Sequence, residues 1–170
     1  MRVVVAGTNG PVGSRLVAGL ADHGVDVVPL YRQDGSDPAT DRGREDMLCG
    51  ADVVVGGTDT SSAADQAGPH AFRSATAGPL AAARKAGVGH HVVLSVVGAE
   101  RLPSGRFRAR PLLEEQVRRS AIPCSIVRTA PSLERVESVV RAGTPRNGGI
   151  RVEPAFMRPV SADDDWLTHQ

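Results

Sequence analysis

The chain opens with Arg2–Val17, RVVVAGTNGPVGSRLV, the stretch that decides the fold. An apolar run that ends at Gly7 is typical of a buried strand, and apolar residues at helical spacing begin at Val12. The glycines between them let the backbone turn sharply and approach a ligand closely. Pro11 stands where the first helical residue is expected, because a missing N–H costs nothing there. A strand, a glycine turn and a helix in this order predict the phosphate site of a dinucleotide-binding fold.

A glycine turn is a weak motif by itself, because tight turns without any function contain the same residues. Its context favours binding, since the turn follows an apolar strand, opens a helix and is succeeded by another strand. The residues of the turn that we expect to bind the cofactor are Gly7, Thr8, Asn9, Gly10, Pro11, Val12 and Gly13.

Composition sets the class of protein. The 170 residues suit one domain, and 41% hydrophobic content, 23% charged content and a net charge of +1 are typical of a soluble globular protein. We therefore expect no nucleic-acid partner and no membrane partner, and the absence of a signal peptide or long apolar run predicts a cytoplasmic location. Cys49 and Cys124 lack metal-type spacing, so we expect both to be buried apolar residues and expect no metal site.

Strands and helices alternate along the chain. The patterns predict strands at residues 25–31, 52–56, 91–95 and 124–128, and helices at residues 12–23, 68–86 and 111–120. This order predicts an α/β fold, a doubly wound parallel sheet with helices on both faces, Rossmann-like and in three layers. Ligands should then bind beyond the carboxyl ends of the strands. The pattern loosens after Thr129.

Two of the expected helices carry detailed predictions. In residues 68–86, Ala71, Ala75, Leu80, Ala81 and Ala83 should form a small-residue face against the sheet, with Gly78 and Pro79 as a potential interruption. In residues 111–120, Leu112, Leu113 and Val117 should face the core, whereas Glu114, Glu115, Arg118 and Arg119 should face solvent. Glu114 and Arg118 have the spacing of a helical ion pair.

Several motifs together resemble those of the NmrA-like, atypical short-chain dehydrogenases. They are the glycine turn, Arg32 after the second strand, GHHVVLSVVG at residues 89–98, and shorter matches at residues 101–103, 113–115, 122–123, 126–129 and 159–164. Members of this family are typically longer. The resemblance therefore implies a single NAD(P)-binding domain over residues 1–170, C-terminally short, in which residues 130–170 are a remnant of the substrate-binding portion.

The resemblance implies bound NADP or NAD, with Arg32 near the adenosine 2′-phosphate. The chemistry agrees, since NAD sites place an acid at the end of the second strand, whereas a guanidinium suits a phosphate. NADP is therefore the expected cofactor, with NAD as the alternative. Two other interpretations stay open, in which Arg32 is a solvated strand-end charge or Asp34 binds a ribose hydroxyl. Thr58, beyond the third strand, is expected to lie along the cofactor.

The catalytic residues of the family are where the likeness weakens. The tyrosine and lysine that commonly serve as proton donor and pKa-lowering partner would fall at Arg106 and Arg110. An arginine does not release its proton near neutral pH and cannot replace a phenol as the general acid. Tyr31 is the only tyrosine and Lys85 the only lysine, and they lie on different elements, so the pair cannot form.

Ser95, at the end of the fourth strand, matches the place where the family's strand approaches the nicotinamide. It is the candidate catalytic residue, as a hydrogen-bond partner of a substrate carbonyl, although a serine that satisfies the backbone is an equal alternative. His90 and His91 begin that strand and so should lie at the end of the sheet opposite the ligand. His70 could lie nearer the ligand, but a surface histidine is the simpler interpretation.

Two functions are consistent with these features. The first is an NADPH-dependent oxidoreductase that transfers hydride to a quinone-like or conjugated carbonyl small molecule, with water as the proton source. The alternative is a non-catalytic NADP-binding redox sensor or regulatory protein, which the loss of the Tyr/Lys pair favours. A homodimer is the assembly that an unpaired strand edge after Val152 would favour.

Overall fold

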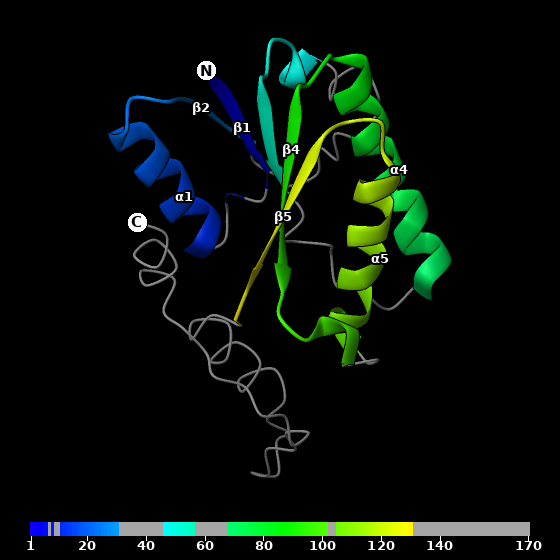
Figure 1. Ribbon diagram of the computed structural model, residues 1–170. Helices are drawn as coiled ribbons and strands as arrows, with labels where there is room; N and C mark the ends of the chain where they lie inside the picture. The colour runs from blue at the N-terminus through cyan, green and yellow to red at the C-terminus, as the bar shows by residue number, and fades with distance from the viewer. Residues whose placement is uncertain (7, 9–10, 31–45, 57–67, 102–104, 131–170) are drawn as a thin grey trace, which may run out of the picture. The chain divides into compact units, whose positions relative to one another are not determined.

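A computed structural model describes residues 1–6, 8, 11–30, 46–56, 68–101 and 105–130 (Figure 1). The elements are strands β1 (Arg2–Ala6), β2 (Asp26–Leu30), β3 (Val53–Gly56), β4 (His90–Val96) and β5 (Cys124–Thr129), helices α1 (Pro11–Asp22), α4 (Gly68–Lys85) and α5 (Gly105–Arg119), and the short 3₁₀ helix η1 (Ala99–Arg101). The chain divides into two compact units, Met1–Arg128 and Thr129–Gln170. The first unit contains the described helices and the sheet up to Arg128. The expectation of one domain with a remnant at residues 130–170 stays a prediction.

The five strands form one sheet in the order β2-β1-β3-β4-β5. β1 pairs in parallel with both β2 and β3, and β3 pairs in parallel with β4. This order is a common form of the doubly wound α/β fold, so the predicted Rossmann-like architecture is confirmed. Pro29 lies on the edge strand β2, where a missing backbone N–H is tolerated.

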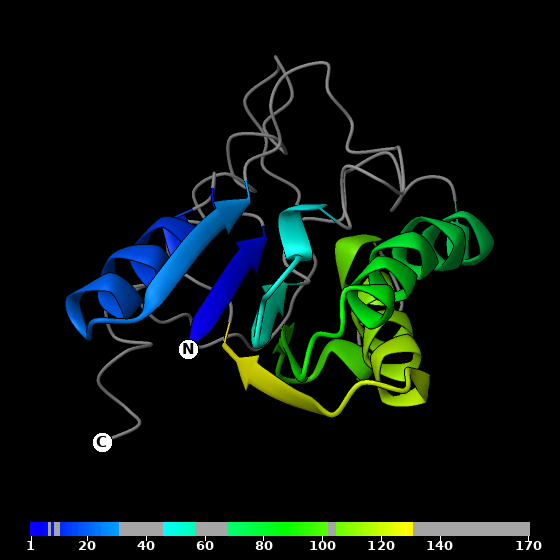
Figure 2. The same ribbon diagram turned by 90° about the horizontal axis from the view of Figure 1, so that it is seen from above.

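Helices cover both faces of the sheet, with α1 on one face and α4 and α5 on the other (Figure 2). Successive residues of a strand point to opposite faces, and the packing follows this alternation. Val3, Val5 and Val55 pack against Leu16, Val17 and Leu20 of α1. Val4 and Val54 pack against Ala82 and Ala83 of α4, and Val93 packs against Leu113 and Val117 of α5. The predicted three layers are therefore confirmed.

The inward face of α4 agrees with the prediction in part. Ala83 is 2% exposed and Leu80 packs against the core, as expected, but Ala82, also 2% exposed, takes the place of Ala81, which is exposed. α4 also continues through Gly78 and Pro79 without a break. Pro79 is exposed, so its ring and its missing N–H disturb only the solvent side of the helix. Tertiary packing of the alanine face outweighs this local cost.

α5 begins at Gly105, six residues before the predicted start at Pro111. A proline near a helical pattern favours a helix start, which is the reason for the prediction. Here Pro111 lies inside the helix, and Leu113 and Val117 beyond it are almost fully buried. The consequence is that Arg106 and Arg110 are both helical, one turn apart.

Two helix ends behave as their glycines predict. Gly24 has a φ of +72°, and its N–H donates to Ala21 O at 2.9 Å, while Val25 N–H donates to Leu20 O at 3.1 Å. Gly87, with a φ of +75°, follows α4. Only glycine adopts this left-handed conformation without strain, so both helices end where the sequence indicates.

One cysteine prediction is wrong. Cys49 is exposed and Cys124 is only partly buried, so the apolar role expected for both holds at most for Cys124. Residues 46–48 are helical, and Cys49 lies in the surface turn that connects them to β3.

Among the described residues, no helix combines the length and apolarity that crossing a bilayer requires.

Candidate functional site

The direction of winding reverses between β1 and β3. Both strands are central in the sheet, yet α1, which follows β1, covers one face, and α4, which follows β3, covers the other. Reversal of this kind opens a crevice beyond the carboxyl ends of the two strands, where ligands of such sheets bind. β1 ends at Ala6 and β3 at Gly56. These strand ends define the candidate cofactor site.

Gly56, at the end of β3, packs beside Ala6 and His91. A side-chain carbon added at Gly56 would lie 3.6 Å from Ala6 Cβ and 3.7 Å from His91 Nε2. These are ordinary van der Waals distances, so a methyl group would fit there without displacing its neighbours.

The described part of the glycine turn agrees with a phosphate site. α1 begins at Pro11, as predicted, and includes Val12 and Gly13 in its first turn. The first backbone N–H groups of a helix lack intrahelical partners and carry the positive end of the helix dipole, so they favour an anion. Thr8 is buried, and its hydroxyl donates to Leu30 O at 3.3 Å. Thr8 therefore ties the turn to β2 through its side chain.

Several predicted residues lie outside the described part of the chain. They are Gly7, Asn9, Gly10, Arg32 and Thr58, and only the backbone of His70 is described, in the first turn of α4. Their expected roles stay predictions. The strands that precede the undescribed residues end at Ala6, Leu30 and Gly56. All three ends lie at the carboxyl ends of the parallel strands, where the site was expected.

Ser95 lies near the carboxyl end of β4, as expected, but beneath α5. It is 3% exposed, and its hydroxyl has no hydrogen-bond partner among the described residues. Arg110, where the resemblance predicts a lysine, is 6% exposed and donates from Nη1 to Leu94 O at 3.4 Å. Ser95 and Arg110 thus both lie near the carboxyl end of β4.

Glu114 was expected on the solvent face of α5, and this prediction is wrong. It is 4% exposed, and its carboxylate accepts hydrogen bonds from Arg128 Nε at 2.9 Å and Arg128 Nη2 at 2.5 Å. Arg118 Nη2 also donates to it at 2.8 Å, which confirms the predicted helical pair. The helical spacing predicts the pair between Glu114 and Arg118. The contact between Glu114 and Arg128 of β5 depends on how α5 packs, and the sequence does not predict it.

The charges around Glu114 hold it ionised. Its hydrogen bonds with Arg128 lower the pKa of the carboxyl to about 2, although its burial acts in the opposite direction. The nearby Ser95 hydroxyl and the Arg118 guanidinium lower the pKa further. Ser95 lies close enough to favour the carboxylate electrostatically without meeting the geometry of a hydrogen bond. Glu114 therefore cannot serve as a proton donor near neutral pH.

The two adjacent histidines begin β4, at the edge opposite the crevice, as predicted. His90 Nε2 lies 2.9 Å from Ser125 Oγ on the surface. His91 is 9% exposed, and its Nδ1 has no partner among the described residues. Burial lowers the pKa of His91 below its usual value, and the nearby His90 lowers it further, so His91 is neutral near pH 7.

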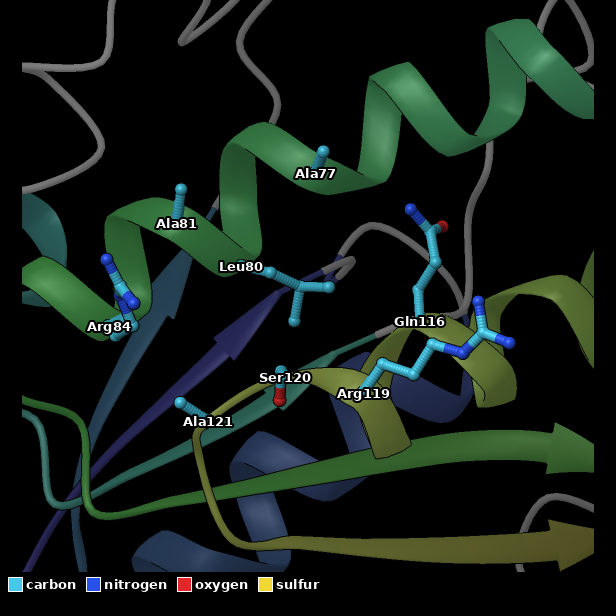
Figure 3. Close-up of a pocket in the computed structure, with 8 residues that line it drawn as sticks. All are labelled: Ala77, Leu80, Ala81, Arg84, Gln116, Arg119, Ser120 and Ala121. Carbon is cyan, nitrogen blue, oxygen red and sulfur yellow. The ribbon is translucent and has the colours of Figure 1, made fainter.

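A groove of about 400 Å³ lies elsewhere, between α4 and α5 (Figure 3). It is lined by Ala77, Leu80, Ala81 and Arg84 of α4 and by Gln116, Arg119, Ser120 and Ala121 at the end of α5. Both helices end there and lead into the starts of β4 and β5. The groove is therefore at the edge of the sheet opposite the candidate cofactor site, and no sequence motif pointed to it.

Comparison with known proteins gives structural likeness only, since no family model and no curated protein matches the sequence. The UDP-glucose 4-epimerase of Thermotoga maritima superposes with a TM-score of 0.67 at 16% identity, over 97% of this chain and 71% of the epimerase. The triphenylmethane reductase of Citrobacter sp., in complex with NADP(H), gives a TM-score of 0.56 at 17% identity, over 84% of this chain and 56% of the reductase.

An NADPH-dependent quinone oxidoreductase of Escherichia coli gives a TM-score of 0.57 at 16% identity, over 84% of this chain and 52% of the oxidoreductase. This chain thus spans little more than half the length of the two reductases. At these identities the likeness concerns the backbone. The chain has the Rossmann-like fold that these NAD(P)-dependent reductases and the sugar-nucleotide epimerase share.

Proposed function

We propose that the protein is an NADPH-dependent oxidoreductase that transfers hydride to a quinone-like or conjugated carbonyl small molecule. The observation that carries this proposal is the reversal of winding between β1 and β3, with a glycine turn and the start of α1 at the same strand end. That arrangement suits the pyrophosphate of a dinucleotide. The NADP(H) in the triphenylmethane reductase and the NADPH dependence of the quinone oxidoreductase support it.

The described residues fit such a cofactor. α1 begins at Pro11, so the start of the helix directly follows the glycine turn, and the Thr8 hydroxyl donates a hydrogen bond to Leu30 O. Arg32, two residues beyond the end of β2, would pair with a 2′-phosphate and favour NADP over NAD. Thr58 would lie along the cofactor beyond β3.

The class of hydride acceptor is limited because the described residues at the carboxyl end of β4 include no general acid. Arg106 and Arg110 replace the Tyr/Lys pair, and the carboxyl of Glu114 is ionised. Bound NADPH would supply the hydride, which reduces the acceptor by two electrons. Without an enzyme-bound acid, the acceptor must hold the resulting negative charge until water protonates it. Quinones and extended conjugated carbonyls do so, which is why we propose them.

Ser95 would contact the acceptor or the nicotinamide only if its hydroxyl becomes accessible, because it is buried beneath α5.

The alternative function, a non-catalytic NADP-binding sensor, rests on the same reversal of winding between β1 and β3. If Ser95 and Arg110 serve only to hold the end of β4, the site binds the dinucleotide without turning it over. The two functions share the cofactor and differ in turnover.

Titration of NADPH and NADH by nicotinamide fluorescence, for the natural protein and for Arg32→Asp, tests the cofactor. We expect NADPH to bind more tightly than NADH in the natural protein, and Arg32→Asp to lower this ratio about tenfold or more, the effect of losing one charge-assisted contact. NADPH oxidation with a quinone panel then separates the functions. Steady turnover supports the reductase, tight binding without turnover supports the sensor, and no binding of either nucleotide rejects both.

A further inference from the structure

The groove between the ends of α4 and α5 takes no part in the proposed function, because it lies at the edge of the sheet opposite the cofactor site. Leu80 projects from α4 toward α5 at its centre (Figure 3) and packs inward against the core beneath α5. The other apolar side chains that line it are all exposed: Ala77, Ala81 and Ala121. Apolar surface gathered in a groove is typical of a contact with another molecule.

Side-chain contacts between the two helices hold the groove in a fixed shape. The Thr76 hydroxyl donates to Gln116 Oε1, and Gln116 Nε2 donates to Arg73 O at 2.9 Å. Glu115 pairs with Arg73 Nη2 at 3.3 Å and with Arg119 Nη2 at 2.8 Å. These contacts tie α4 to α5, so a molecule that enters the groove does not have to order the two helices first.

The charged side chains that line the groove are both cations, Arg84 of α4 and Arg119 of α5, and no carboxylate is among its lining residues. Glu115, at the border, is shared between Arg119 and Arg73, so one carboxylate faces two guanidinium groups. Arg84 is exposed and has no ion-pair partner among the described residues. The groove and its border therefore carry an excess of positive charge.

The end of α4 does not use the Arg84 side chain. Basic side chains in the last turn of a helix can donate to its free carbonyl groups. Here the backbone satisfies them, because the N–H groups of residues 86–88 donate to the carbonyls of residues 82–84 at 2.9 to 3.2 Å. The donors of the Arg84 guanidinium are thus available to an anion from another molecule.

The same charges disfavour a second copy of this chain as the occupant of the groove. A twofold-symmetric interface brings the same patch of both subunits together. Arg84 and Arg119 would then lie against their own counterparts, with no carboxylate among the lining residues to pair with them. Like charges placed together in this way lower the affinity. The occupant that complements the groove is therefore a different molecule, apolar on one side and acidic beside it.

We infer that the groove between α4 and α5 is a docking surface for an acidic amphipathic helix of a partner protein. The apolar stripe of that helix would cover Leu80 and the alanines, as in other complexes in which a helix lies in a groove. Carboxylates beside the stripe would pair with Arg84 and Arg119. A contact of this size is typical of a weak, transient complex. The inference does not depend on the proposed function, since the groove and the cofactor site lie at opposite edges of the sheet.

A matched pair of synthetic peptides tests the docking surface. The peptide AEELAEALAELAEEA places leucines on one helical face with glutamates beside them, and its counterpart has glutamine at every glutamate. NMR of the full chain, labelled in its alanine and leucine methyl groups, follows each titration. We expect the acidic peptide to shift the signals of Ala77, Leu80 and Ala81 with a Kd of about 100 µM, and the neutral peptide to bind at least about fivefold more weakly.

Three variants assign the binding to the groove. Arg84→Gln should weaken binding of the acidic peptide about fivefold and change that of the neutral peptide less than about twofold. Arg15→Gln removes the same charge on α1, at the other face of the sheet (Figure 2), and should change neither. Ala81→Glu adds bulk and negative charge to the groove and should abolish binding of the acidic peptide. Because Ala81 is exposed, circular dichroism should show that this variant keeps its fold.

Several results would overturn the inference. They are an acidic peptide that shifts no signal of the groove, equal binding of the two peptides, and an equal effect of Arg15→Gln and Arg84→Gln. Light scattering of the chain alone tests for a second copy, since a dimer that Ala81→Glu dissociates would assign the groove to self-association. Binding to phosphatidylglycerol vesicles that Arg84→Gln weakens, without peptide binding, would assign it to a lipid surface.

Discussion

Glu114 of α5 and Arg128 of β5 form a two-point ion pair, in which Arg128 Nε donates to Oε1 at 2.9 Å and Nη2 donates to Oε2 at 2.5 Å. The carboxylate is nearly inaccessible to water, whereas the guanidinium is about half exposed. Nearness to Glu114 raises the pKa of Arg128 above its usual value, so both partners stay charged. The pair fixes α5 against β5, the neighbour of β4 in the sheet.

The first prediction concerns this pair. Glu114→Gln should lower the free energy of unfolding by about 2 kcal/mol, because charge-assisted hydrogen bonds to a buried group are lost. Urea denaturation measures the change. Glu115→Gln is the matched control, since Glu115 also meets two arginines, Arg73 at 3.3 Å and Arg119 at 2.8 Å, but on the surface. It should cost less than about 0.5 kcal/mol. Equal losses in the two variants would contradict a special role for Glu114.

A second prediction follows from the acidity of Glu114. Its pKa is about 2 in the folded protein, against an ordinary value of 4.5 for the unfolded chain, so the unfolded chain binds more protons between these values. The stabilisation is complete above about pH 4.5 and disappears as the pH falls toward 2. Denaturation at stepwise lower pH should therefore show the gap between the natural protein and Glu114→Gln closing in this window. A gap that stays constant would show that Glu114 titrates normally.

His91 supplies the third prediction. Burial lowers its pKa below 6.5, so the folded protein keeps it neutral while the unfolded chain takes up a proton. Stability is fully present above about pH 6.5 and should fall as the pH drops below that value, until the folded pKa is reached. His91→Leu should remove this pH dependence just below about pH 6.5, as measured by thermal unfolding. His90→Gln, a surface change beside it, should leave most of the slope in place, because burial is the larger cause of the low pKa of His91. A slope that survives in His91→Leu refutes the assignment.

The fourth prediction concerns the end of α4. Gly87 has a φ of +75°, and a side-chain carbon there would meet nothing within 4 Å, so only backbone strain opposes a substitution. Gly87→Ala should cost about 1 kcal/mol in urea denaturation. Gly87→Asn should cost less, because asparagine tolerates the left-handed conformation better. If alanine and asparagine cost the same, the left-handed conformation is not the reason for the glycine.

The strand and the helix on either side of the glycine turn were predictable because their signals are local. The strand, the glycine turn and the start of α1 at Pro11 lie in consecutive residues, and backbone preferences of glycine and proline act over that range. The turns at Gly24 and Gly87 were found for the same reason. On α4 the burial of Ala83 was predicted, but Ala81 was expected in place of Ala82, because these alanines have the same chemistry and differ only in where packing turns the helix.

The sequence by itself determined the doubly wound architecture, since β-branched runs and helical periodicities alternate and each needs a covered face. It also determined that no Tyr/Lys pair can form, because the chain has one tyrosine and one lysine on different elements. Only the tertiary structure decided that α5 starts at Gly105, that Glu114 turns inward to Arg128, and that Ser95 is covered. These outcomes depend on contacts between elements far apart in the chain, where burial and charge pairing outweigh the local preferences that a sequence reveals.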